Sequence, residues 1–249
     1  MLGKLQLFFK MSREAGLSKT FTYLYRRFIR GHEDEALPNT VSMNRWVWTN
    51  MDWSKGGEEW SGSADWKESL IKHVLEAHIP IGSRVLEIGP GAGRWTESLL
   101  RRAAHLIAVD VTPKCIEICR EKFNGFPNAE FHVNDGRDLS FIPMGSVDRI
   151  WSFDVFVHIN TVDVENYVRQ FSQILAPGGL GIIHHAKNGI YKPAWRSDMT
   201  AEKMREFCAR HGLVIVTQFD SWDNGRTCAY LGASGERPDI ITVFSKPER

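Results

Sequence analysis

Short apolar runs alternate with helix-patterned segments from residue 65 onward. Each run has the length and composition of a buried strand, and the segment after it has apolar residues at helical spacing. The expected strands are Arg84–Ile88, Leu106–Asp110, Glu130–Asn134, Val147–Asp154, Leu180–His184, Leu213–Phe219 and Asp239–Phe244. The expected helices run from a cap at Asp65 to about His78, then Arg94–Ala104, Pro113–Phe123, Val162–Leu175 and Thr200–His211. This alternation predicts an α/β fold with a mostly parallel sheet covered by helices on both faces.

The first 64 residues lack this alternation. Residues 1–30 carry seven Lys and Arg residues against one acid, Glu14, and large apolar residues lie between them. Such a basic amphipathic segment suits a membrane surface, a second subunit, or a helix pair packed on its own domain. Gly31–Thr40 is acidic and then turn-forming, so residues 1–40 are predicted to be a helical extension with a linker.

Tryptophans are concentrated just before the alternating region. Residues 45–66 contain five of them, in a stretch rich in Gly and Ser. The spacing fits neither one helix face nor one strand. We therefore interpret residues 41–64 as a lid over a site, and residues 65–249 as the main domain.

Composition narrows the picture without naming a function. The length of 249 residues suits one domain with an appendage, and a net charge of +1 gives no general attraction to nucleic acid or membrane. The four cysteines form no CxxC pair, which predicts a reducing compartment. No apolar run is long enough to span a bilayer and no signal peptide is recognisable, so the expected location is the cytoplasm.

The stretch Arg84–Trp95, RVLEIGPGAGRW, joins the first strand to a glycine turn. Its glycines follow GxGxG, and Arg94 stands where the dinucleotide motif GxGxxG has its last glycine. A carboxylate at the strand end, Glu87, is unfavourable beside a pyrophosphate and useful beside an ammonium group. Asp110 ends the second strand, and Asp135 follows the third. These groups suit an adenosine with a cationic amino-acid tail, and a nicotinamide oxidoreductase is disfavoured.

Five segments in order resemble the class I S-adenosylmethionine-dependent methyltransferases over roughly residues 65–245. They are VLEIGPGAGRW, VD at 109–110, NDGRDL at 134–139, VDRIWSFDVFVHI at 147–159 and LAPGGLGIIHH at 175–185. The resemblance implies a Rossmann-like sheet of seven strands with the last one antiparallel. It also implies S-adenosylmethionine as cofactor and S-adenosylhomocysteine as product.

The resemblance assigns cofactor contacts residue by residue. Glu87 and the backbone of the three glycines would hold the methionine part, Asp110 the ribose, and Asp135 with Gly136 the adenine. Ser152 or Phe153 would pass close to the cofactor. The full set implied is Glu87, Gly89, Gly91, Gly93, Trp95, Asp110, Val111, Asp135, Gly136, Arg137, Ser152 and Phe153.

The methyl acceptor is indicated by fewer residues. His158 and Asp154 are the predicted catalytic residues. His158, four residues after Asp154, occupies a loop where a histidine acts as base in several small-molecule members of this family, and imidazole titrates near neutrality. A capping or substrate-orienting role for His158 stays open. His184 or His185, Trp60, Trp195 and Arg196 are the expected substrate contacts.

The preferred reading is O-methylation of a small molecule or saccharide. N-methylation of a small amine and a non-catalytic, partner-binding subunit remain as alternatives. No metal ligand set is expected. The segment SFDV replaces the Pro-Pro sequence of amide and adenine N-methyltransferases, and no basic RNA-binding domain is attached, so no nucleic-acid partner is expected.

Overall fold

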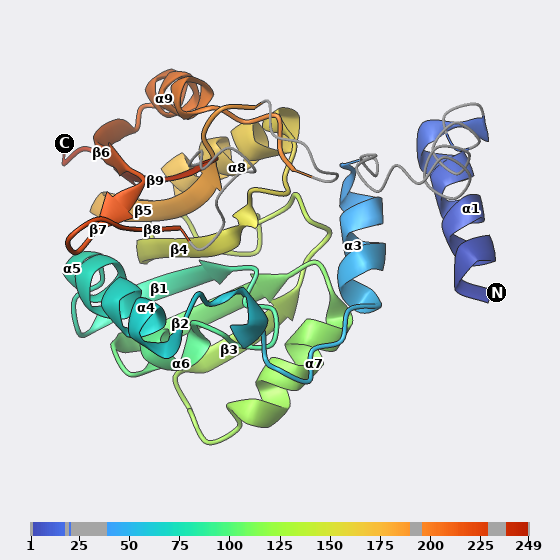
Figure 1. The fold of residues 1–249 in the computed structure, drawn as a ribbon. Coiled ribbons are helices and arrows are strands. Elements are labelled where there is room, and N and C mark those ends of the chain that lie inside the picture. Colours follow the sequence, from blue (N-terminus) through green and yellow to red (C-terminus); the bar gives the residue numbers. More distant parts are fainter. Residues whose placement is uncertain (1, 18–19, 21–38, 190–195, 229–237, 249) are drawn as a thin grey trace.

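Seven strands form one twisted sheet at the centre of the molecule (Figure 1). The computed structural model describes residues 2–17, 20, 39–189, 196–228 and 238–248. The strand order is β3-β2-β1-β4-β5-β9-β6, and β9 runs antiparallel to both of its neighbours. The strands are β1 (Ser83–Ile88), β2 (Ala103–Asp110), β3 (Ala129–Val133), β4 (Val147–Phe156), β5 (Leu175–Ala186), β6 (Val214–Phe219) and β9 (Asp239–Ser245). The predicted fold class is confirmed.

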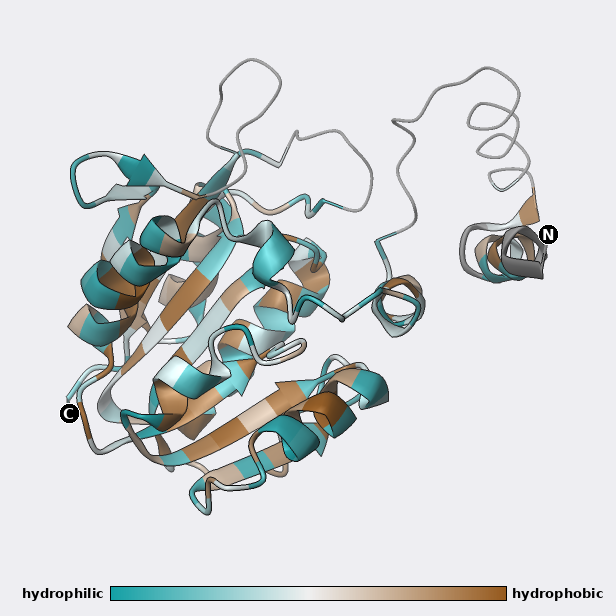
Figure 2. Cartoon of the chain, turned by 60° about the horizontal axis from the view of Figure 1, so that its bottom comes forward, coloured by the Kyte–Doolittle hydropathy of each residue, from teal (hydrophilic) through white to brown (hydrophobic). Residues whose placement is uncertain are grey.

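Helices cover both faces of this sheet. One face carries α4 (Ala64–Leu70), the π-helical turn η2 (Ile71–Leu75), α5 (Glu76–His78), α6 (Thr96–Leu100) and α7 (Pro113–Lys122), and the other carries α8 (Thr161–Ile174) and α9 (Ala201–Arg210). Alternate residues of the central strands pack against the helices of opposite faces. Trp151 packs on the face of α4 to α7, and Ile150 packs on the face of α8 and α9. Figure 2 shows the hydrophobic segments concentrated on the strands, as expected for a sheet buried on both faces.

Several element boundaries differ from the prediction. Ser63, not Asp65, caps α4, because its hydroxyl accepts the backbone N–H of Trp66. The helix expected over Arg94–Ala104 spans only Thr96–Leu100, because the chain turns at Arg101–Arg102 and Ala103 already pairs with Ser83. Capping and strand pairing therefore decided these ends, as they often do.

Several strands are longer than expected, and a hairpin was missed. The turn predicted at Pro177–Gly179 is part of β5, because Leu175 pairs with Val147 of β4 and the glycines exchange backbone hydrogen bonds with Lys246. β4 continues past Asp154 to Phe156. The hairpin of β7 (Ser221–Trp222) and β8 (Arg226–Thr227) is too short for an alternation pattern to indicate.

The N-terminal part lies beside the sheet domain. Helix α3 (Val41–Thr49) lies between the domain and α1 (Leu2–Ala15) in both views (Figures 1 and 2). Met11 of α1 and Met43 of α3 are each 1% exposed and belong to one small apolar cluster. The rest of the predicted basic segment and most of the linker fall outside the described residues. Among the helices that the structure describes, none is long and apolar enough to cross a membrane.

Candidate functional site

A cavity of about 490 Å³ opens at the carboxyl ends of the parallel strands. Its walls come from the loops after β1, β2, β3 and β4 and from the segment that contains α3. This is the edge at which open α/β sheets bind ligands, and the volume suits a small molecule.

The glycine turn forms one wall of this cavity. Gly89, Gly91 and Trp95 line it, whereas Gly93 lies beneath, against Phe123 and Cys119. Gly91 has φ +56°, and a Cβ there would stand 3.0 Å from the ring of Trp53. Glycine at this position therefore gives Trp53 room to lie directly over the turn.

Two carboxyl groups lie behind the turn. Asp110 lines the cavity at the end of β2, and its carboxylate accepts the backbone N–H groups of Gly91 (3.2 Å) and Thr112 (2.8 Å). Glu87 is 1% exposed and does not line the cavity; its Oε2 accepts the Thr96 hydroxyl at 2.8 Å. The Oε1 atom of Glu87 has no hydrogen-bond partner among the described residues.

The pKa values of these two acids are both raised. Burial is the main cause for Glu87, with Asp110 adding to it and the Thr96 hydrogen bond opposing it, and its pKa rises to about 8. Burial also raises the pKa of Asp110, against the hydrogen bonds from Thr112 and Gly91. A buried carboxyl with an unpartnered oxygen indicates that a polar group is missing from the site.

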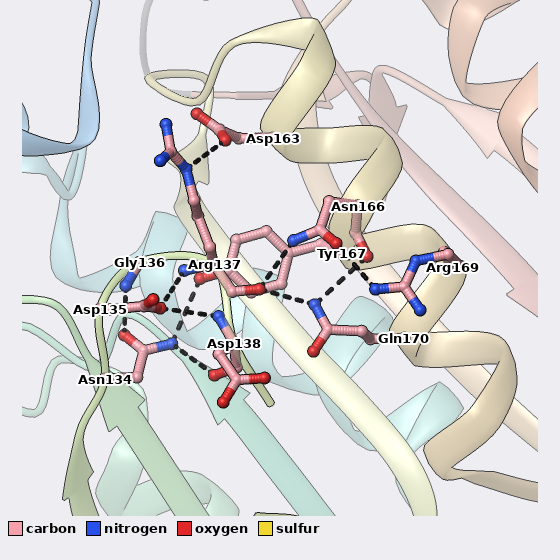
Figure 3. Close-up of polar contacts among 10 residues, drawn as sticks. All are labelled: Asn134, Asp135, Gly136, Arg137, Asp138, Asp163, Asn166, Tyr167, Arg169 and Gln170. Atoms are coloured by element: carbon pink, nitrogen blue, oxygen red, sulfur yellow. Dashed lines mark hydrogen bonds and ion pairs between the residues drawn. The ribbon is translucent and has the colours of Figure 1, made fainter. Parts of the chain in front are cut away.

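The loop after β3 shapes the far end of the cavity (Figure 3). Asn134 and Gly136 line it, but Asp135 turns away, and its Oδ1 accepts the backbone N–H groups of Arg137 and Asp138, both at 2.8 Å. Arg137 also lies outside the lining and pairs with Asp163 at 2.7 Å. The structure thus places Asn134 and Asp163 at the cavity wall, and neither Asp135 nor Arg137 lies there. The cofactor roles given to Asp135 and Arg137 stay predictions.

Asp163 and Tyr167 reach this end from α8, which the sequence did not suggest. Both line the cavity, and the Asn134 side-chain amide donates to the Tyr167 hydroxyl at 3.3 Å (Figure 3). Burial raises the pKa of Tyr167, so the phenol stays neutral. Their wall position depends on how α8 crosses the sheet, which local sequence does not encode.

Asp154 comes from the end of β4, and His158 comes from the loop after it. Both line the cavity, whereas Ser152 lies behind the wall and donates its hydroxyl to the Ile88 carbonyl at 2.9 Å. Phe153 lines the cavity, as predicted for a residue close to the cofactor. The catalytic roles predicted for His158 and Asp154 and the cofactor contact predicted for Phe153 stay predictions.

Asp154 is paired with Arg94 and His184. Its Oδ2 lies 2.5 Å from Nη1 of Arg94, and its Oδ1 lies 3.2 Å from Nδ1 of His184. Burial opposes ionisation of Asp154, but the hydrogen bond and charge of His184 and the charge of Arg94 outweigh it and hold the pKa of Asp154 well below its usual range. For His184, burial likewise opposes the charged form, while Cys228 and Asp154 together raise its pKa to about 10.

Neither histidine of β5 lines the cavity. His184 lies behind Asp154, with its ring stacked on Phe153 at 4.2 Å between centroids. His185 is fully buried and bonded to the Thr242 hydroxyl, and burial lowers its pKa to about 3. Arg196 does line the cavity, and it forms an ion pair with the buried Asp239. Trp195 lies outside the described residues.

The five tryptophans of residues 45–66 divide into three groups. Trp48, Trp53 and Trp60 line the cavity with ring centroids 5.7 to 6.1 Å apart, and the Trp48 ring lies 5.3 Å from that of His158. Trp66 packs into the core against Trp95 and Phe153. Trp46 packs toward α1. The sequence pattern showed the cluster but not this division.

Helix α3 is fastened to both ends of the cavity. The Asn44 side-chain amide donates to the His158 carbonyl at 2.9 Å. Arg45 donates to the carbonyls of Val111 (2.8 Å) and Asn134 (3.1 Å). Val111, a predicted cofactor contact, also lines the cavity. Asn44, Arg45 and Arg94 were not predicted as site residues, because no motif contains the first two and Arg94 was considered only as a departure from GxGxxG.

A family model described as a methyltransferase domain matches residues 85–179. Together with the strand order, this match identifies the core of the chain as a class I S-adenosylmethionine-dependent methyltransferase domain. The cofactor of this domain class is S-adenosylmethionine.

Relatives of several activities share parts of the chain. A ubiquinone biosynthesis O-methyltransferase from Xanthomonas axonopodis pv. citri (strain 306) is 29% identical over 110 residues, 44% of this chain and 45% of that protein. A ribosomal RNA small subunit methyltransferase A from Dehalococcoides mccartyi is 54% identical over 59 residues, 24% of this chain and 20% of that protein. The chain thus spans less than half of the length of these relatives.

Solved structures share the fold over a larger part of the chain. The N-methyltransferase NodS from Bradyrhizobium japonicum WM9, in complex with S-adenosylhomocysteine, superposes with a TM-score of 0.63 at 18% identity. The match covers 84% of this chain and 99% of that one. At this identity the likeness describes the fold, and the acceptor must be argued from the site.

Proposed function

We propose that this protein is an S-adenosylmethionine-dependent O-methyltransferase that acts on a hydroxyl group of a small molecule or saccharide, with His158 as general base. The observation that carries the proposal is one cavity whose lining includes the glycine turn, Asp110, Asp154 and His158. The relatives show that the same domain serves both small-molecule and RNA acceptors, so the acceptor is inferred from this chain's own side chains.

The residues at the glycine turn fit the cofactor. The unpartnered Oε1 of Glu87, behind the turn, can accept a hydrogen bond from the ammonium end of the methionine part, and the Asp110 carboxylate suits the ribose hydroxyls. When bound, S-adenosylmethionine supplies an electrophilic methyl group on a positive sulfur. The remaining chemistry belongs to the protein: it orients the acceptor, excludes water and accepts a proton.

His158 is the side chain at the acceptor end that can take up this proton. Its neutral imidazole accepts the hydroxyl proton as the acceptor oxygen forms its bond to the methyl carbon. The Trp48 ring and the Asn44 bond to the backbone carbonyl hold the His158 loop in place. Asp154 stays ionised beside Arg94, so it orients the acceptor and does not compete for the proton.

The segment 41–64 acts as the lid in this proposal. Trp53 covers the glycine turn, and Arg45 fastens α3 to the loops after β2 and β3. Aromatic rings at the acceptor end exclude water and offer flat faces to a sugar or aromatic ring. The expected location is the cytoplasm, and residues 1–30 are the proposed contact for a membrane surface or a second subunit.

Substitution of His158 tests the proposed base. With a panel of hydroxylated acceptors, His158→Ala should lower kcat by about 10² to 10⁴-fold, the usual contribution of a general base. Calorimetric affinity for S-adenosylhomocysteine should stay within about twofold, since His158 lies at the acceptor end. His132→Ala, an exposed histidine paired with Glu130, is the matched control and should leave kcat unchanged.

The pH profile separates the alternatives. If the acceptor is an amine, His158→Ala should recover most activity at high pH, because the amine deprotonates itself. If the protein binds the cofactor weakly or not at all, the partner-binding alternative is favoured.

A further inference from the structure

The part of the cavity beside Val111 is lined by the loop after β3 and by the first turns of α8. Its walls are apolar, because a Cβ built on Gly136 would lie 2.5 Å from Val41 and 3.3 Å from Val111, and all three residues line the cavity. Val111 directly follows Asp110, whose carboxylate suits the ribose hydroxyls. These walls therefore suit the adenine ring of a cofactor whose ribose lies at Asp110.

Adenine carries an exocyclic amine, which donates hydrogen bonds and needs an acceptor on the protein. Among the described residues, the acids that line the cavity are Glu59, Asp110, Asp154 and Asp163. Asp154 pairs with Arg94, next to the glycine turn, and Glu59 belongs to the lid segment. Asp163 is thus the carboxylate that reaches the cavity beside the loop after β3.

The Asp163 carboxylate is held in place by Arg137. Nε of Arg137 lies 2.7 Å from Oδ1 of Asp163, and the two side chains are 59% and 9% exposed (Figure 3). Arg137 lies outside the cavity lining, so it balances the charge of Asp163 from the solvent side and leaves Oδ2 for a ligand. Asp163 also lies in the first turn of α8, where the helix dipole favours a carboxylate.

The two polar side chains that follow β3 are already bonded within the protein. Asp135 does not line the cavity, and its Oδ1 accepts two backbone N–H groups of its own loop, both at 2.8 Å (Figure 3). Asn134 does line the cavity, but its amide donates to the Tyr167 hydroxyl at 3.3 Å and its Oδ1 accepts the Gly136 N–H at 3.1 Å. The acid that the family resemblance assigns to the adenine is therefore turned into its own loop.

We propose that Asp163 of α8, in place of Asp135, accepts the hydrogen bond of the adenine amine and so selects adenine over other purine rings. The inference rests on the cofactor of the domain class and not on the proposed methyl acceptor. Hypoxanthine has a carbonyl oxygen where adenine has the amine. That oxygen would face the Asp163 carboxylate, and two hydrogen-bond acceptors repel each other.

Calorimetric binding of S-adenosylhomocysteine and S-inosylhomocysteine tests this proposal without turnover. We expect the wild-type protein to bind the adenosine compound about 10- to 100-fold more tightly, the range of one hydrogen bond to a charged group. In Asp163→Asn this preference should fall below about threefold. The amide oxygen can stay on Arg137, and the NH₂ group then faces the ring, where it donates to the carbonyl oxygen of the inosine compound.

Asp135→Asn is the matched control, since it makes the same chemical change in the neighbouring loop. The amide oxygen of asparagine can still accept the two backbone N–H groups, so the loop keeps its turn. This variant should keep the full preference for the adenosine compound. Asp163→Ala, a favourable residue within a helix, is the second variant in case Asp163→Asn fails to fold, and it should lose the preference as well.

Each outcome bears on the proposal. A preference that survives both Asp163 variants would overturn it, and so would a preference that Asp135→Asn abolishes. Equal affinity for the two compounds in the wild-type protein, or no binding of either, would overturn it too. The proposed O-methylation is read separately, by methyl transfer and by the effect of His158→Ala, so it can fail while this inference stands.

Discussion

Three carboxyl groups stand at strand ends in this site, and each has a different environment. Asp110 is tied to two backbone N–H groups, Asp154 is clamped by Arg94 and His184, and Glu87 is buried with one oxygen unpartnered. The sequence identified all three positions. It could not rank their charge states, because burial and neighbouring charge set these and both arise from the fold.

Glu87 should make the stability of the ligand-free protein depend on pH. Its pKa is about 8 when folded and 4.5 in its ordinary environment, so between these values the folded state keeps a proton that the unfolded state has lost. The stabilising contribution is thus fully present below about pH 4.5 and is lost as the pH rises through 8. We expect the midpoint of thermal unfolding to fall more between about pH 5 and pH 8.5 in the wild-type protein than in Glu87→Gln, because glutamine stays neutral. Parallel curves for the two proteins would show that Glu87 is ionised throughout.

At the scale of elements, α3 is held by contacts that no periodic pattern foretells. Arg45 bonds to two loops, Asn44 to a third, and Val41 packs against Gly136. The tryptophan-rich composition predicted a lid here, and three of these tryptophans, Trp48, Trp53 and Trp60, line the cavity. It did not indicate that residues 41–49 are helical, although Thr40 caps the helix by accepting the Met43 N–H.

Gly136 should be needed for α3 to pack against the loop after β3. A Cβ there would lie 2.5 Å from Cγ1 of Val41, and φ is +85°. Gly136→Ala should lower the free energy of unfolding by about 1 kcal/mol or more, since both backbone strain and the contact with Val41 oppose the methyl group. It should also weaken S-adenosylhomocysteine binding, because Gly136 lines the cavity. Gly125→Ala, with open space around the added methyl, is the control and should change neither quantity in urea unfolding and calorimetry.

At the scale of the whole molecule, the chain is a sheet domain with α3 and α1 added in sequence along one side (Figure 1). Helix α1 packs on α3 through Met11 and Met43, while Phe9 is 63% exposed and Leu17 is 59% exposed. Helix α1 therefore packs through one side, and the role predicted for residues 1–30 stays a prediction.

The attachment of α1 should be separable from the stability of the sheet domain. Met11→Asp places an unpaired charge in the α1–α3 contact and should make proteolytic cleavage within α1 about tenfold faster, since the buried charge costs more than 1.4 kcal/mol. Phe9→Asp, on the exposed side of the same helix, should leave the rate unchanged. The midpoint of thermal unfolding should change little in both variants. A large fall for Met11→Asp would mean that α1 supports the whole domain.

The sequence by itself determined the succession of strands and helices, the glycine turn and the acids at the strand ends. These follow from local periodicity, turn chemistry and spacing, which act over a few residues. Tertiary structure decided which of these groups face one cavity: Asp135 turns into its own loop, His185 goes into the core, and Arg94 and His184 converge on Asp154. Such choices depend on residues 30 to 60 positions apart meeting across the sheet, as Asp154 does with His184 and Arg94, so no local pattern contains them.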